Sequence, residues 1–106
     1  MGRKPAIPPC PYDSGVREAH WEWLKETNPE GLAAMCADGP ERLDRYMDAM
    51  ARRYNETAQA IRDRWEARPE VQELKNSDPA TYLDRAAMKS RQADEIAFAQ
   101  VVAPSY

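Results

Sequence analysis

Residues 40–67 read PERLDRYMDAMARRYNETAQAIRDRWEA, and this stretch decides the fold. Its apolar side chains recur every three or four residues, which places them in one stripe along a single helix. Pro40 suits the first turn of a helix, and no glycine or proline interrupts the stretch after it. The pattern predicts a helix over 40–67 that is roughly 40 Å long. The stripe consists of Leu43, Met47, Met50, Tyr54, Ala58, Ile61 and Trp65.

A second long helix is expected over 79–102, after a short connector at 69–77. Ser77 or Asp78 is expected to cap it, and Pro79 suits its first turn. At roughly 36 Å this helix would match the first in length, and the pair would form an antiparallel hairpin. The positions expected to face inward are Val71 and Leu74 in the connector, then Leu83, Ala86 or Ala87, Ser90, Ala93, Ile96 or Ala97, and Val101.

Two shorter helices are expected before the hairpin, over 15–27 and 29–37. Asp13 or Ser14 is expected to cap the first of them. Both would pack across the hairpin. The fold class is therefore all-α, a small helical bundle built on a long antiparallel helical hairpin.

The composition limits the size of the core. The chain has 106 residues, of which 17 are Ala and only 13 are Leu, Ile, Val or Phe. This length predicts one helical domain over 13–103, preceded by an extended proline-rich arm over 1–12. A small core of this kind is often completed by association, so a homodimer is one expectation. The formal net charge of −3 argues against a protein that coats nucleic acid.

No pattern in the sequence indicates catalysis, a cofactor or a metal. His20, Cys10 and Cys36 are too few for a structural zinc site, which needs four ligands. His20 is expected to be a packed histidine near the inner face of its helix. The sequence has no glycine-rich phosphate loop, no secretion signal and no apolar run that could span a membrane. We therefore expect a cytoplasmic protein that is not an enzyme and has no membrane partner.

The helix at 15–27 offers one set of candidate contact residues. Glu18, Glu22 and Glu26 follow one another at every fourth position and form an acidic row. Such a row either faces solvent or docks a basic partner. Trp21 and Trp23 cannot both face the core, so one of them is expected at the surface or beneath the proline arm. We take Trp21 as a candidate contact residue.

Cations on the two long helices offer a second set. Asp44, Asp48 and Arg52 are spaced for ion pairs within the helix, so these charges could form a solvated face. Alternatively, the cations contact phosphate or an acidic partner. Arg85 and Lys89 are like charges one turn apart, which favours a partner. The candidates are Arg45, Arg52 and Arg53 on the first long helix, and Arg85 and Lys89 on the second.

Residues 23–43, WLKETNPEGLAAMCADGPERL, resemble the start of the transposon-encoded TnpV family. The resemblance extends over about 16–102, and its aromatic near Tyr82 is often Trp in that family. It implies an accessory protein carried by mobile elements of Gram-positive bacteria, without established catalytic residues. The segments that carry it are Trp23-Leu24-Lys25-Glu26, Pro29, Leu32, Gly39, Glu73-Leu74-Lys75, Asp78, Tyr82 and Ala93-Asp94-Glu95-Ile96.

These observations predict a non-enzymatic interaction protein of a bacterial mobile element. Its partner would be a recombinase or another protein–nucleic acid complex, with nucleic acid contacted through that complex. An alternative is an anti-defence inhibitor, such as an anti-CRISPR protein, that blocks a host nuclease. A third hypothesis, an excisionase-like DNA-binding factor, is disfavoured by the sequence pI of about 5.2.

Overall fold

The computed structural model describes residues 7–104, and this part of the chain is all-α. Residues 1–6 of the predicted arm lie outside the described residues. No strand occurs between residues 7 and 104, so the predicted fold class is confirmed. The elements are α1 (Gly15–Thr27), α2 (Pro29–Ala37), α3 (Pro40–Glu66), α4 (Pro69–Ser77), α5 (Pro79–Ala97) and a π-helical segment η1 (Phe98–Val102).

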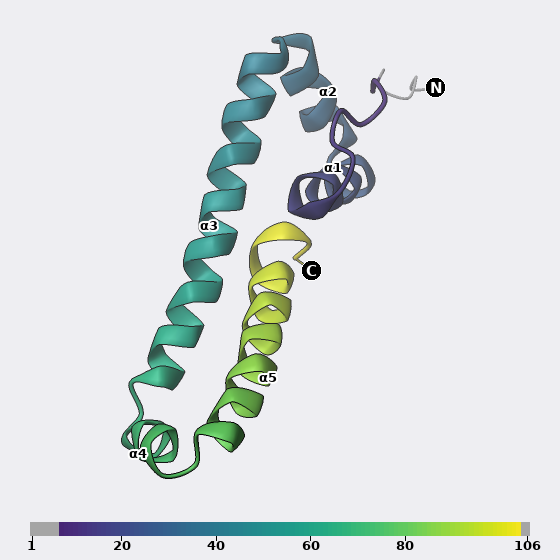
Figure 1. The fold of residues 1–106 in the computed structure, drawn as a ribbon. Coiled ribbons are helices and arrows are strands. Elements are labelled where there is room, and N and C mark those ends of the chain that lie inside the picture. Colours follow the sequence, from purple (N-terminus) through teal and green to yellow (C-terminus); the bar gives the residue numbers. More distant parts are fainter. Residues whose placement is uncertain (1–6, 105–106) are drawn as a thin grey trace.

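The two long helices α3 and α5 run antiparallel and are joined by α4, as Figure 1 shows. Their predicted similar length is confirmed, because α3 has 27 residues and the 19 residues of α5 continue directly into the five residues of η1, which end at Val102. Helix α5 itself packs along the second half of α3, and η1 contacts α3 further along. Helices α1 and α2 cover the first half of α3, and α1 also contacts η1 at the end of α5, so the predicted packing across the hairpin is confined to this end (Figure 1).

Prolines and capping side chains set the helix boundaries. Helices α2, α3, α4 and α5 each begin with proline, whose missing N–H costs nothing in the first turn. The side chain of Asn28 caps α2, since it accepts a hydrogen bond from Gly31 N at 3.1 Å. Asp78 caps α5 in the same way through Thr81 N at 3.3 Å. Ser14 lies at the start of α1, but its side chain forms no capping hydrogen bond.

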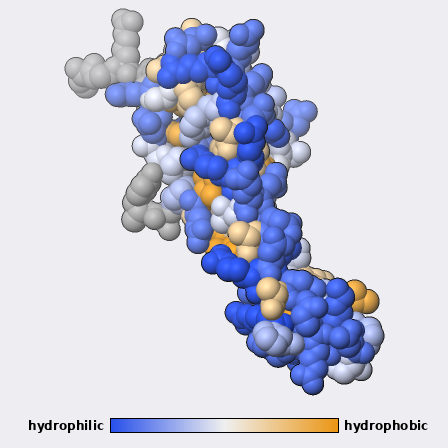
Figure 2. Space-filling model, turned by 90° about the vertical axis from the view of Figure 1, so that its left-hand side faces the viewer, coloured by the Kyte–Doolittle hydropathy of each residue, from blue (hydrophilic) through white to orange (hydrophobic). Residues whose placement is uncertain are grey.

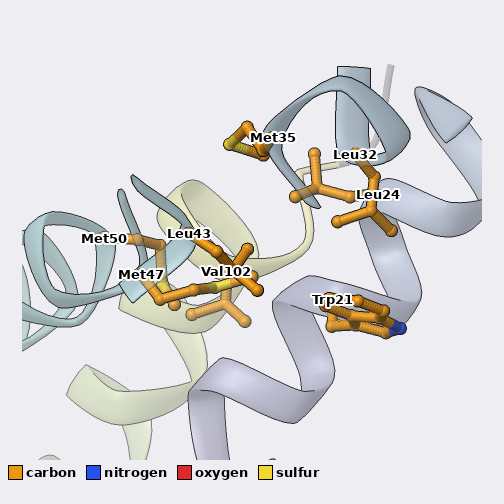
Figure 3. Packing of buried hydrophobic residues seen from close by; sticks show 8 residues of the cluster. All are labelled: Trp21, Leu24, Leu32, Met35, Leu43, Met47, Met50 and Val102. Atoms are coloured by element: carbon orange, nitrogen blue, oxygen red, sulfur yellow. The ribbon is translucent and has the colours of Figure 1, made fainter. Parts of the chain in front are cut away.

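The main core lies where α1, α2, the first half of α3 and η1 meet. Eight buried side chains form it, and Figure 3 shows them converging from these elements. Val102 of η1 is fully buried among them, so the C-terminal segment completes this core. The cluster comprises Trp21, Leu24, Leu32, Met35, Leu43, Met47, Met50 and Val102.

The rest of the hairpin has a much thinner core. Ala58 of α3 packs against Ala93 and Ala97 of α5, with Tyr54 and Ile61 at the edge. These alanines permit the two helices to approach closely, but they bury little apolar area. The larger apolar side chains of α5 are exposed and do not pack in this interface; they are Leu83, Met88 and Ile96.

Two predictions for the inward face of α5 are settled by these contacts. Leu83 is 64% exposed, so its predicted inward position is wrong. Tyr82 takes that place, because it stacks on Trp65 of α3. Of the two candidates Ile96 and Ala97, Ala97 is buried while Ile96 is 41% exposed.

The molecule is elongated, with extents of 65 × 27 × 20 Å. Figure 2 shows one long face, which is mainly hydrophilic and carries only small, separate hydrophobic patches. Among the described residues, no helix is both long enough and apolar enough to cross a membrane. The α4 end and the α1 end of the molecule are therefore separate surfaces on one rod-like body.

Candidate functional site

Trp65 and Tyr82 form an aromatic pair near the α4 end of the hairpin. Their ring centroids lie 5.9 Å apart and their planes differ by 16°. The Tyr82 hydroxyl donates to the Glu66 carboxylate, at 2.8 Å from Oε1 and 2.7 Å from Oε2. This hydrogen bond raises the pKa of Tyr82. Tyr82 is thus held in one orientation, and it fixes the indole of Trp65 between α3 and α5.

Two adjoining hollows lie beside Trp65, and we call them together the Trp65 groove. Their volumes are about 260 Å³ and about 210 Å³. Trp65, Arg68 and Lys89 line both of them. The first is completed by Ile61 and Arg64, and the second by Arg85, Met88 and Gln92.

The charge in the Trp65 groove has one sign. Its ionisable lining groups are all cations, and no carboxylate lines either hollow. None of these cations forms an ion pair with any residue from 7 to 104. Other cations of the chain are paired: Arg17 with Asp48, Arg42 with Asp38, Arg62 with Asp94, and Lys75 with Glu66. The unpaired cations of the groove are Arg64, Arg68, Arg85 and Lys89.

A third hollow, of about 170 Å³, also borders Trp65 but has mixed charge. Asp63 and Glu66 line it together with Arg62 and Lys89. Arg62 there forms an ion pair with Asp94 of α5, at 3.0 Å. Of these three hollows, the two of the Trp65 groove are therefore the ones whose ionisable lining groups are all cations.

The structure brings together some of the predicted cations and separates others. Arg85 and Lys89 line the groove, Arg85 being exposed and Lys89 half-buried. Arg45, Arg52 and Arg53 are exposed on α3 and line none of the hollows described above. They form no ion pair within the described part of the chain.

The ion pairs expected for Arg52 are not formed. Asp48 pairs instead with Arg17 of α1, at 2.8 Å. Asp44 accepts a hydrogen bond from the Tyr12 hydroxyl at 2.9 Å, and burial together with this hydrogen bond raises the pKa of Tyr12. Both carboxylates therefore hold preceding segments against α3. Interactions between distant segments have replaced pairs within the helix.

Trp21 does not lie at the surface, because only 1% of it is exposed. It packs in the core beneath the proline arm, where it borders a hollow of about 230 Å³. The prediction that Trp21 is an exposed contact residue is therefore wrong. Trp23 is half-buried and donates from Nε1 to the carbonyl oxygen of Pro104 at 2.9 Å. The hollow is lined by Pro8, Pro9, Pro11, Trp21, Cys36, Gly39, Pro40 and Leu43.

The predicted acidic row lies on α1, at the other end of the hairpin from α4 (Figure 1). Glu22 and Glu26 are exposed, and Glu18 is half-buried. None of the three forms an ion pair with a residue that the structure describes. The molecule therefore presents an acidic surface at one end and the cationic Trp65 groove toward the other.

The histidine and the cysteines are placed as structural groups. His20 is 2% exposed, and both of its ring nitrogens lie within hydrogen-bond distance of a partner. Cys10 and Cys36 are both free thiols, and burial raises the pKa of Cys36. Between residues 7 and 104, no group of three or more His, Cys, Asp or Glu side chains could hold a metal ion.

Sequence reasoning missed the α3 side of the groove. Arg64 and Arg68 are like charges four residues apart in the sequence, the same spacing that singled out Arg85 and Lys89, although α3 ends at Glu66 and Arg68 precedes α4. Trp65 lies between them in the sequence and was assigned to the helical stripe alone. What could not be derived was the antiparallel register that brings these two cation pairs together in the lining of the Trp65 groove.

Comparisons of the chain with protein-family models, with curated proteins and with solved structures gave no match. The resemblance to the TnpV family therefore stays a prediction.

Proposed function

We propose that this chain is a non-enzymatic interaction protein of a bacterial mobile element. It binds a protein or protein–nucleic acid complex, such as a recombinase assembly, through the Trp65 groove. The observation that carries this proposal is a set of unpaired cations around Trp65. These cations are Arg64, Arg68, Arg85 and Lys89. A cytoplasmic location and a homodimer remain part of the same proposal.

The cation cluster is difficult to explain as a contribution to folding. Like charges one turn apart on a helix destabilise it slightly, and Arg85 and Lys89 on α5 are such a pair. Eighteen acidic residues are present in the chain, yet none of those in the described region pairs with these cations. An anionic partner that entered the groove would remove the repulsion. Charge complementarity of this kind also accelerates association and excludes wrong partners.

Affinity capture from cells that carry the mobile element tests the proposal. The bait is the full chain, compared with an Arg85→Gln/Lys89→Gln variant and with an Arg52→Gln/Arg53→Gln control. The control removes the same charge from exposed positions outside the groove. We expect recombination or DNA-processing proteins with the wild type and the control, and their loss with the groove variant. Capture that lacks such proteins, or is equal for all three baits, contradicts the proposal.

A second candidate function rests on the acidic row of α1. Glu22 and Glu26 are exposed and unpaired among residues 7–104, so they could occupy the nucleic-acid groove of a nuclease. An inhibitor of this class, such as an anti-CRISPR protein, would protect a plasmid from interference by a host nuclease. A plasmid-interference assay with Glu22→Gln/Glu26→Gln as the test variant distinguishes the two functions. Protection that this variant loses and the groove variant keeps supports the inhibitor.

A further inference from the structure

We infer that the Trp65 groove binds a segment of single-stranded nucleic acid, with phosphates against its cations and a base against Trp65. This inference rests on the proposed function, because it names the occupant of the same groove. Four features of the groove support it: the type of its cations, their spacing, the position of the indole and the charge around it.

The cations of the groove suit phosphate. Three of the four are arginines, and the planar guanidinium group offers paired N–H donors that match two phosphate oxygens. Arg64 and Arg68 follow one another along the chain by four residues, as Arg85 and Lys89 do along α5. Within α5 this spacing corresponds to about 6 Å, whereas Arg64 lies at the end of α3 and Arg68 directly precedes α4. The groove therefore offers cations from several segments rather than a single point charge.

The indole of Trp65 suits a base. Tyr82 stacks on it at 5.9 Å, yet Tyr82 lines neither hollow of the groove. The hollows therefore meet a part of Trp65 that Tyr82 leaves uncovered, and Trp65 is only half-buried. Grooves that combine cations with an aromatic stacking surface are typical of proteins that bind single strands, because every base has a π face.

The surrounding charge favours a single strand over a duplex. Asp63 and Glu66 line the neighbouring hollow on Trp65, so an anion wider than the groove would meet carboxylates. The formal net charge of the chain is −3, which opposes binding of a polyanion outside the groove. A narrow strand places its phosphates on the groove cations alone. A duplex would present a broader band of phosphate than these cations could neutralise.

The salt dependence of binding follows from the number of cations. Single strands lose affinity with salt at a log–log slope of about −0.7 for each neutralised phosphate. Four cations therefore predict a slope no steeper than about −2.8. Removing two of them should reduce the slope by about 1.4.

Fluorescence anisotropy with a labelled twelve-residue oligothymidylate tests the inference in the full chain. The test variants are Arg85→Gln/Lys89→Gln, which removes two groove cations, and Trp65→Leu, which removes the π face. Arg52→Gln/Arg53→Gln is the matched charge control. Thermal melting by circular dichroism establishes that each variant is folded. A hairpin duplex and a glutamate-rich peptide of equal charge serve as competitors.

We expect the Arg85→Gln/Lys89→Gln variant to bind more weakly and with the reduced salt slope. Trp65→Leu should bind at least about five-fold more weakly with the slope unchanged, since stacking does not release counterions. The control should match the wild type, and the competitors should compete poorly. If Trp65→Leu does not fold, the salt slope of the Arg85→Gln/Lys89→Gln variant still decides whether the groove cations neutralise phosphates.

Three results would overturn the inference: no binding at low salt, equal losses in the groove variant and the control, or stronger competition by the duplex. Competition by the glutamate-rich peptide that exceeds that of unlabelled oligothymidylate would instead assign the groove to an acidic protein segment. In that case the proposed function stands, provided that capture from nuclease-treated lysate still depends on Arg85 and Lys89. If that capture does not depend on Arg85 and Lys89 and the full chain does not bind the oligonucleotide, both the proposed function and the inference on single-stranded nucleic acid are contradicted.

Discussion

His20 links helix α1 to the C-terminal segment through both of its ring nitrogens. Nδ1 lies 2.6 Å from the carbonyl oxygen of Val102 and must carry the proton there, because a carbonyl only accepts. Nε2 of the neutral ring then accepts from the Tyr46 hydroxyl at 2.7 Å. The ring also stacks on Trp23 and Tyr46, with centroids 5.2 Å and 5.5 Å away. One side chain thus joins α1, α3 and η1.

Replacing His20 with alanine is expected to lower the free energy of unfolding by about 2–4 kcal/mol, because the buried carbonyl of Val102 and the half-buried hydroxyl of Tyr46 lose their partner and a cavity remains. Urea denaturation measures the change. Tyr46→Phe removes one of the two hydrogen bonds and serves as the graded control, with an expected loss of about 1 kcal/mol. A loss for His20→Ala no larger than that for Tyr46→Phe would contradict the linking role.

The same histidine predicts how stability depends on pH. Burial lowers its pKa below 6.5, and nearby Arg53 lowers it further, against the hydrogen bond to Val102. Below pH 6.5 the unfolded chain therefore binds the proton more readily than the folded chain. The contribution of neutral His20 to the free energy of unfolding is therefore fully present above pH 6.5 and is lost as the pH falls below it. We expect the difference in melting temperature between wild type and His20→Gln to shrink from pH 7.5 to pH 5. A constant difference would contradict this.

The sequence predicted a packed histidine here, and its burial confirms that. The helical spacing near position 20 was sufficient, because it places His20 toward the inner face of α1. The partner could not be predicted. Val102 lies 82 residues away, and its carbonyl oxygen is free to accept because Val102 ends the helical segment, where the last carbonyls have no partner within the helix.

Among the elements, the corner between α2 and α3 depends on Gly39. Its φ of 104° and ψ of 164° belong to a region that residues with a Cβ atom rarely adopt. Pro40 begins α3 directly after it. The corner therefore needs glycine for its backbone conformation and not for space, since a Cβ atom at this position would meet no atom within 4 Å beyond its chain neighbours.

We expect Gly39→Ala and Gly39→Asn to destabilise the protein by about 1–3 kcal/mol each. Asparagine tolerates the ordinary left-handed helical region, but it gains nothing at this combination of angles. Chemical denaturation of the three proteins in parallel measures the effect. An asparagine variant as stable as the wild type would show that the corner adopts a different backbone conformation.

Helix boundaries were the most predictable part of the elements. Proline begins four of the helices, and its fixed φ and missing N–H act locally, so sequence alone reveals them. The change from α5 to η1 at Phe98 was missed, because no local signal marks it. Val102 of η1 is buried in the core, and such packing depends on the assembled fold and not on the local sequence. The exposure of Leu83 was missed for a similar reason, since Tyr82 takes the contact with Trp65.

At the scale of the whole molecule, the core is unevenly distributed along a rod. The Cα radius of gyration is 18.5 Å, compared with about 13 Å for a compact domain of this length. The large buried side chains gather at the α1 end, while alanines hold the middle of the hairpin. Val71 is the buried residue of α4. The end that carries the Trp65 groove therefore has less buried apolar area to stabilise it.

Hydrogen exchange should reveal this imbalance. We expect backbone amides of α4 and the first turns of α5 to exchange through local opening, with lower protection than those in the first half of α3. Mass spectrometry of peptic peptides measures both regions in one experiment. Addition of oligothymidylate should raise protection at α4 and α5 if the groove is occupied. Uniform protection along the rod would contradict the uneven core.

The burial of Val102 has a consequence for how the protein is made. The main core needs a side chain that the ribosome adds some 80 residues after His20. Until then α1, α2 and the first half of α3 expose the apolar surface that η1 will cover. Tertiary folding of the main core is thus coupled to the synthesis of residue 102, and a nascent chain stalled before that residue would be a substrate for chaperones and proteases.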